Sequence, residues 1–261
     1  MNIRSIGFSV ACLACLTAVA GDWQQANDLA VQDGLSSQSE LFESALNVEF
    51  RATRAGFLRI SDPVLSDPQV APVVISQLSD VTVAYAERYG WADALVRYFP
   101  QHPDKGAAYG EAWLGLITSL QSEALVDVLI RGLRNADTDT AIEGLTWACD
   151  STNPIYRLAG VETIGWHADG QLMSSELLNG LTDSRPEVRA AAARSMGWKE
   201  LMIGRDALTT SLTDVDPEVR LQSIRALKRV DEDYARALPI MARLAEDEDA
   251  RVARAAARVL E

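Results

Sequence analysis

The chain has 261 residues, of which 48% are apolar and 23% charged, proportions that are ordinary for a soluble globular protein. Its formal net charge of −13 disfavours binding to nucleic acid, whose phosphates it would repel, and gives no reason to expect binding to anionic lipid. Residues 21–183 hold 23 acidic and 9 basic side chains, whereas residues 185–261 hold 14 of each. The two parts should therefore present different surfaces, although both could simply be solvated.

The N-terminus has the features of an export signal. Arg4 supplies a positive charge, an apolar stretch runs over residues 6–17, and residues 18–20 read Ala-Val-Ala, the small-x-small pattern before a cleavage site. We predict a signal peptide over residues 1–20, a polar segment over 21–37, and export, with the periplasm as the expected compartment. The apolar run is too short to predict a membrane span, so none is expected in the mature chain. The alternative is a lipoprotein anchored through Cys12 or Cys15, which would also be an exported protein.

Residues 38–149 are predicted to be helical but irregular, either as diverged repeats or as a helical N-terminal cap. No strong alternating pattern predicts a strand anywhere in the chain. Apolar residues at helical spacing indicate helices over Ser39–Arg54, Pro68–Tyr89, Trp91–Tyr98, Ala107–Ser119, Ser122–Arg134 and Thr140–Cys149.

Residues 150–261 contain an internal repeat, which is the most informative feature of the sequence. Segments 153–157, 185–189 and 216–220 read NPIYR, RPEVR and DPEVR, and a degraded copy, DARVA, covers 249–253. Each segment is expected to open a helix, because Asn153 or Asp216 can cap free N–H groups and proline is tolerated at the first helical position. A second helix follows each of them, so one unit is a helical hairpin of 31–33 residues.

This pattern resembles the HEAT-repeat family, in the short variety known as PBS-lyase-like HEAT repeats. The residues that carry the resemblance are the D-x-x-P-x-V-R motifs at 183–189 and 214–220 and the Ala-rich helix that follows each. The resemblance implies an all-α fold, an α-α superhelix of stacked hairpins with a concave surface lined by the second helices. This architecture, together with the lack of a catalytic motif, leads us to expect a protein partner and to predict no cofactor and no metal.

Two sets of side chains recur at repeat spacing. Arg157, Arg189 and Arg220 could bind a carboxylate-rich partner, or each could pair with an inter-repeat aspartate such as Asp183, Asp214 or Asp216. Trp166 and Trp198 each follow a glycine nine residues after a repeat arginine. They could form an aromatic strip for a partner, or they could close the hydrophobic core.

The last predicted helix carries Arg251, Arg254 and Arg258 on one face, at spacings of three and four residues. These arginines could supply the polar outer face that a terminal repeat needs, or they could be a docking site. Val252, Val259 and Leu260 are expected to lack the cover that apolar residues have in the earlier repeats. We take Trp166, Trp198, Arg251, Arg254 and Arg258 as candidate partner-binding residues.

No catalytic motif is found, and no catalytic or metal-binding residue is predicted. Cys149 and His167 would lie on successive helices, but a cysteine in an apolar run is more often inert. We therefore predict an exported scaffold or adaptor for protein interactions in the cell envelope. The alternative is an enzyme or small-ligand binder with its site in the N-terminal helical half, where aromatic residues are dense: Tyr85, Tyr89, Trp91, Tyr98, Phe99, Tyr109 and Trp113.

Overall fold

The computed structural model describes residues 103–261 and the isolated positions 78–80, 88, 92 and 96. Every regular element in residues 103–261 is a helix, which confirms the predicted all-α fold. The predicted signal peptide, the polar segment 21–37 and the helix over Ser39–Arg54 lie outside the described residues, as do most of Pro68–Tyr89 and Trp91–Tyr98. Of the described helices, none is both long and apolar enough to cross a membrane.

The chain divides into two compact units between Asp137 and Thr138. In the first unit, α6 (Pro103–Ser119) packs against α7 (Glu123–Gly132), which η3 (Leu133–Asn135) follows. Trp113 is buried in this unit, and its Nε1–H donates to the carbonyl oxygen of Leu129 at 3.1 Å. A Cβ on Gly132 would lie only 2.6 Å from the Trp113 ring, so the glycine makes room for the indole. Trp113 is therefore a packing residue.

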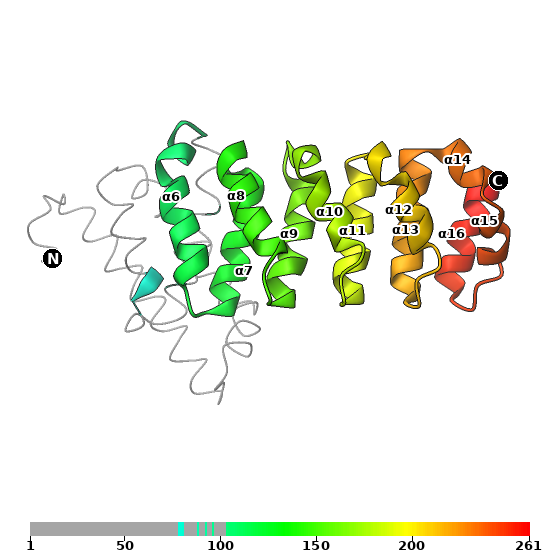
Figure 1. Cartoon of the computed structure of the whole chain (residues 1–261), viewed down its shortest axis with the longest axis horizontal. Coiled ribbons are helices and arrows are strands. Elements are labelled where there is room, and N and C mark those ends of the chain that lie inside the picture. Colours follow the sequence, from blue (N-terminus) through cyan, green and yellow to red (C-terminus); the bar gives the residue numbers. More distant parts are fainter. Residues whose placement is uncertain (1–77, 81–87, 89–91, 93–95, 97–102) are drawn as a thin grey trace, which may run out of the picture. The chain divides into compact units, whose positions relative to one another are not determined.

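The second unit is a series of short helices that follow one another in sequence order (Figure 1). We call α9, α11, α13 and α16 the first helices, and α10, α12 and α15 the second helices. The elements are α8 (Thr138–Cys149), α9 (Pro154–Trp166), η4 (Gly170–Met173), α10 (Ser174–Gly180), α11 (Pro186–Trp198), η5 (Met202–Gly204), α12 (Arg205–Ser211), α13 (Pro217–Val230), α14 (Glu232–Ala237), α15 (Pro239–Leu244) and α16 (Ala250–Leu260). Each first helix packs against the next one along the row, and each second helix packs against the first helix that follows it.

The predicted helix starts are confirmed. Asn153 accepts a hydrogen bond from the N–H of Ile155 at 2.9 Å, and Pro154 occupies the first helical position of α9. Asp216 caps α13 in the same way, accepting from the N–H of Glu218 at 2.8 Å. Each cap satisfies an N–H that the helix itself cannot pair. Helix α11 also begins at a proline, Pro186, but without a side-chain cap.

Small residues let the first helices approach closely. Residues 190–193 of α11 are four consecutive alanines, all buried. A Cβ built on Gly197 would lie 2.7 Å from the Cα of Ala226 on α13, closer than real Cβ contacts allow. Ser195 donates to the carbonyl oxygen of Val161 on α9 at 2.8 Å, so the small side chain also pairs with the neighbouring backbone. The core of this unit therefore runs along the row of first helices.

The expectation that the last helix leaves its valines uncovered is wrong. Val252 and Val259 are fully buried, because α16 packs against α13, α14 and α15. Leu260 alone among the three is partly exposed. The sequence reasoning considered only the missing helix after α16, whereas the cover comes from the helices that precede α16.

Candidate protein-interaction face

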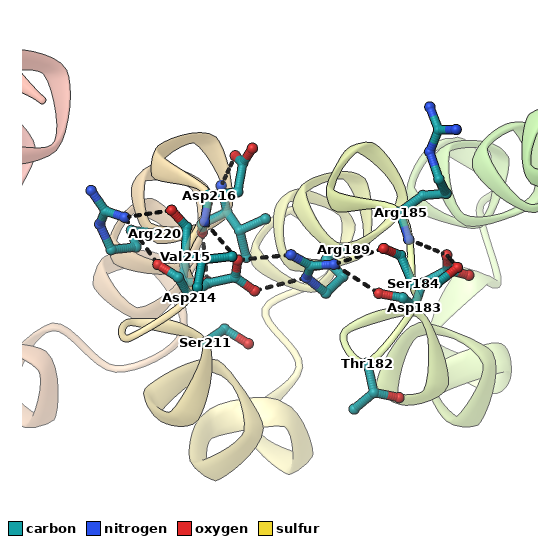
Figure 2. Close-up of polar contacts among 12 residues, drawn as sticks. Thr182, Asp183, Ser184, Arg185, Arg189, Ser211, Asp214, Val215, Asp216 and Arg220 are labelled. Carbon is teal, nitrogen blue, oxygen red and sulfur yellow. Dashed lines mark hydrogen bonds and ion pairs between the residues drawn. The ribbon is translucent and has the colours of Figure 1, made fainter.

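The repeat arginines form a ladder of ion pairs, each linking one unit to the next. Figure 2 shows the middle pair, Arg189–Asp214. In every pair the guanidinium meets both carboxylate oxygens, a bidentate geometry that fixes orientation as well as distance. The Nε–Oδ2 distances are 2.6 Å for Arg157–Asp183, 2.7 Å for Arg189–Asp214 and 2.9 Å for Arg220–Asp247. The structural interpretation of these arginines is thus confirmed, with Asp247 as the third acceptor.

Each ladder residue also holds a turn. Nη1 of Arg189 donates to the carbonyl oxygens of Asp183 and Ser184, in the turn that precedes its own helix. Asp214 accepts from the N–H of Asp216, two residues further on, at 2.9 Å. Figure 2 shows these contacts converging on the turns before α11 and α13. The ladder is therefore occupied by structural contacts and is not available to a partner.

The two imperfect copies of the motif mark the ends of this ladder. Ser151 stands at the position of the aspartates, and its Oγ accepts the turn hydrogen bond from the N–H of Asn153 at 3.1 Å. Ala253 stands at the position of the arginines, on α16. Because Ser151 carries no charge and Ala253 no donor, neither position leaves a charged group without its partner.

The ladder predicts a specific response to acid. Burial alone would raise the pKa of Asp214, but the hydrogen bonds from Arg189 and from the N–H of Asp216 outweigh it and lower the pKa. The pKa of Asp247 is lowered chiefly by its hydrogen bond from Arg220. Because these folded-state pKa values lie below the unfolded value of about 3.9, their stabilisation is complete above that pH and is lost as pH falls below it. Urea unfolding followed by circular dichroism should show this loss between about pH 4 and pH 2.

The matched control is Asp214→Asn, which removes the titrating group but keeps an oxygen for the turn. It should lower stability at pH 6 and make the stability–pH curve shallower below pH 4. An unchanged slope would show that the ladder does not govern acid unfolding.

The tryptophan pair lies on the row of first helices. Trp166 at the end of α9 is 62% exposed, so the interpretation that it closes the core is wrong. Its ring lies 4.6 Å, centroid to centroid, from that of the half-buried Trp198 at an angle of 49°. The Arg194 guanidinium lies 5.3 Å from the Trp198 ring and binds Glu162 at 2.5 Å. Trp198 thus contacts both Trp166 and Arg194, while the Trp166 ring is largely open to solvent.

The three terminal arginines divide into two kinds. Arg251 pairs with Glu218 at 2.8 Å and with Asp249 at 2.9 Å, so it ties α16 to α13 and supports its own helix start. Arg254 and Arg258 are exposed and have no acidic partner among the described residues. Those two line a groove between α13 and α16, which is the position that a docking site requires.

Two grooves open between neighbouring first helices. The α11–α13 groove has a volume of about 410 Å³ and is lined by Arg194, Trp198, Arg225 and Arg229. The α13–α16 groove has a volume of about 370 Å³ and is lined by Arg225, Lys228, Arg254 and Arg258. Sequence reasoning missed Arg225 and Arg229. The available signal was register: Arg194, Arg225 and Arg258 each lie five residues after the position of the repeat arginine.

Cys149 and His167 are not brought together. Cys149 lies beside Gly160, whose Cβ would meet its Sγ at 2.8 Å, and Gly160 is seven residues, or about 10 Å of helix, from His167. Burial, and then the negative charges of Glu176, Asp150 and Asp183, raise the pKa of the Cys149 thiol to about 12. Neither the separation of these two residues nor the raised pKa of the thiol supports a catalytic pair of nucleophile and base.

This raised pKa predicts that the Cys149 thiol is alkylated slowly. At pH 8 the folded protein should react with iodoacetamide on the order of a thousandfold more slowly than free cysteine, because the thiolate is the reacting form. Mass spectrometry of the time course measures the rate, and the same protein in 6 M guanidinium chloride is the control. A rate near that of the unfolded chain would contradict the burial of this group.

The structure defines the second unit as a solenoid of stacked helical hairpins. Residues 174–261 match the family model of HEAT repeats, so this stretch is similar to that family. The same ladder and cap extend the repeat back to α9. HEAT and related solenoids generally serve as surfaces for protein binding.

One solved structure agrees with this chain at the level of the fold, and two others show weaker similarity. An engineered protein from a structural genomics consortium is 17% identical, covers 90% of this chain and 67% of its own, and has a TM-score of 0.52. A designed armadillo repeat protein is 16% identical, with 73% of this chain and 99% of that chain covered and a TM-score of 0.44. Human deoxyhypusine hydroxylase is 13% identical, with 94% and 96% covered and a TM-score of 0.38. The comparison with curated proteins gives no match.

Proposed function

We propose that this protein is an interaction scaffold that binds a protein partner on the face formed by its first helices. The observation that carries the proposal is the exposed Trp166, in tilted contact with Trp198, which lines one of two arginine-rich grooves. The grooves favour the first helices, rather than the second helices that the family resemblance suggested, as the binding face.

The composition of this face supports binding. Tryptophan and arginine are the residues that most often dominate the energy of protein interfaces. A large aromatic ring held in place by Trp198 has little conformational freedom to lose when a partner covers it. By contrast, Trp113, from the aromatic set that suggested a ligand site, is buried with its Nε1–H paired. Tyr85, Tyr89, Trp91, Tyr98 and Phe99 lie outside the described residues.

Export to the cell envelope, with the periplasm as the compartment, is the second part of the proposal. It rests on the sequence of residues 1–20 and on a mature chain that keeps Cys149 as its single cysteine. Cell fractionation and mass spectrometry of the purified native protein test it. The expected N-terminus is Gly21, or an acylated cysteine for the lipoprotein alternative. A cytoplasmic protein that retains residues 1–20 would contradict the proposal.

Site-specific photocrosslinking in the native cell tests the binding face. A benzophenone amino acid at Arg229 should capture a discrete partner, whereas the same group at Thr210, exposed on the second helix α12, should not. Trp166→Ala should reduce the capture at Arg229, because it removes the exposed aromatic ring while leaving the core intact. Capture only at Thr210, or at neither position, would rule out the first-helix face.

A further inference from the structure

The two grooves are neighbours along the row of first helices, and we call the two together the path. Arg225 projects from α13 and lines both, so the α11–α13 groove and the α13–α16 groove meet at this side chain. Trp198 lies at the α11 end of the path, and the Trp166 ring contacts it in a tilted arrangement. Each groove falls in the lower part of the range of about 300–1,000 Å³ that is typical of ligand sites.

The path carries uncompensated positive charge. Arg225, Arg229, Arg254 and Arg258 are all exposed, and we call these four residues the basic track. Within the described part of the chain, none of the four forms an ion pair. Two acids of the same row of helices are already bound: Glu162 by Arg194, and Glu218 by Arg251. The track therefore lacks the ion pairs that the other arginines of this unit form, with the exception of Arg243 on α15.

One atom beside the track is also left unsatisfied. Nε of Arg194, a residue that lines the α11–α13 groove, is buried and has no hydrogen-bond partner in the described residues. A buried donor without an acceptor costs about 1–3 kcal/mol, so native proteins seldom keep one without a use.

We infer that the partner segment is an extended, acidic stretch of another protein, laid across α11, α13 and α16 with its carboxylates on the basic track. This inference rests on the proposed function. Neighbouring helix axes are about 8–10 Å apart, which an extended chain covers in about three residues. An acidic residue at every third position would therefore meet α13 and then α16. An apolar or aromatic residue at the α11 end would lie on the Trp166–Trp198 pair.

Charge complementarity favours an acidic protein segment over nucleic acid. A polyanion would extend beyond the track and meet the field of a chain whose net charge is −13. A short peptide places its carboxylates on the track alone, and guanidinium groups bind carboxylates with bidentate geometry. A second copy of this chain is also acidic over residues 21–183, so self-association has to be tested separately.

Fluorescence anisotropy with the full mature chain tests the inference. The probe is a fluorescein-labelled peptide of 12 residues with one phenylalanine near its N-terminus and glutamate at every third position after it. A peptide with glutamine in place of glutamate is the control. We expect the acidic peptide to bind at least about tenfold more tightly at low salt, and to weaken as salt is raised, because exposed charges are screened.

Matched variants locate the site. The pair Arg225→Glu and Arg258→Glu, made together, should weaken binding of the acidic peptide by at least about tenfold, because two attractive charges become repulsive. Arg243→Glu, an equally exposed arginine on the second helix α15, should leave binding unchanged. Circular dichroism of each variant confirms that the helices remain.

Several results would overturn the inference. These are equal binding of the glutamine peptide, equal weakening by Arg243→Glu, tighter binding of a thymidine oligonucleotide of the same length, and a concentration-dependent dimer that the double variant abolishes. If the acidic peptide does not bind while the crosslink at Arg229 persists, the scaffold proposal stands and the inference of an acidic partner is wrong. If both fail, the scaffold proposal fails as well.

Discussion

Replacing Gly197 with leucine is expected to lower the free energy of unfolding by about 3 kcal/mol or more, because the side chain must enter a space that α13 already fills. A Cβ at this position would lie 2.7 Å from the Cα and 3.0 Å from the Cβ of Ala226. The nearest atom belongs to the backbone, so no side-chain rotation can relieve the contact. The first helices would have to move apart, and the loss would spread to the neighbouring core.

Leucine is a better helix former than glycine, so helix propensity works against the predicted loss. The control is the same substitution at Gly115 in α6, where nothing lies within 4 Å of an added Cβ. Gly115→Leu should therefore be neutral or stabilising by up to about 0.8 kcal/mol. Urea unfolding followed by circular dichroism measures both. A neutral Gly197→Leu would show that α11 and α13 do not approach as closely as the structure places them.

The helices of the second unit could be predicted from sequence because their signals are local. The proline at the first helical position and the capping Asn153 or Asp216 act within one turn, so they recur wherever the motif recurs. The ion-pair ladder could also be anticipated, since an arginine and an aspartate at fixed positions in every unit meet when the units stack. Asp216 shows the limit of that reasoning, because it serves as a cap while Asp247 takes the third arginine.

The candidate site was only partly predictable, because it depends on contacts between helices rather than within them. Trp166 and Trp198 share a register, yet one is exposed and the other is half-buried. Arg251 is paired while Arg258 is not, although both lie on one face of α16. Exposure and pairing are decided in each case by the residue on the adjacent unit, and the repeat pattern does not specify that residue. The untested assignments of residues 1–37 to a signal peptide and a polar segment remain predictions.

Removing the last rung of the ladder should have an effect as large as overpacking. Arg220→Met is expected to lower the free energy of unfolding by about 3 kcal/mol, because it leaves the carboxylate of Asp247 buried without its partner. The two side chains are only 10% and 9% exposed. The substitution also removes the donors that Nη1 offers to the carbonyl oxygens of Asp214 and Val215. Methionine fills a similar volume, so the loss reports on charge and hydrogen bonds rather than on a cavity.

A second substitution separates charge from hydrogen bonding. In the Arg220→Met background, Asp247→Asn should restore about 1 kcal/mol or more, because no charge then remains buried, while Oδ1 can still accept from the N–H of Asp249. Arg225→Met is the control for a surface arginine and should change stability by less than about 0.5 kcal/mol. If Arg220→Met cost no more than Arg225→Met, the ladder would be a surface ion pair without consequence. The expected order of these stability losses would show that Arg220 stabilises the stack of repeats, whereas Arg225 of the basic track is free to bind a partner.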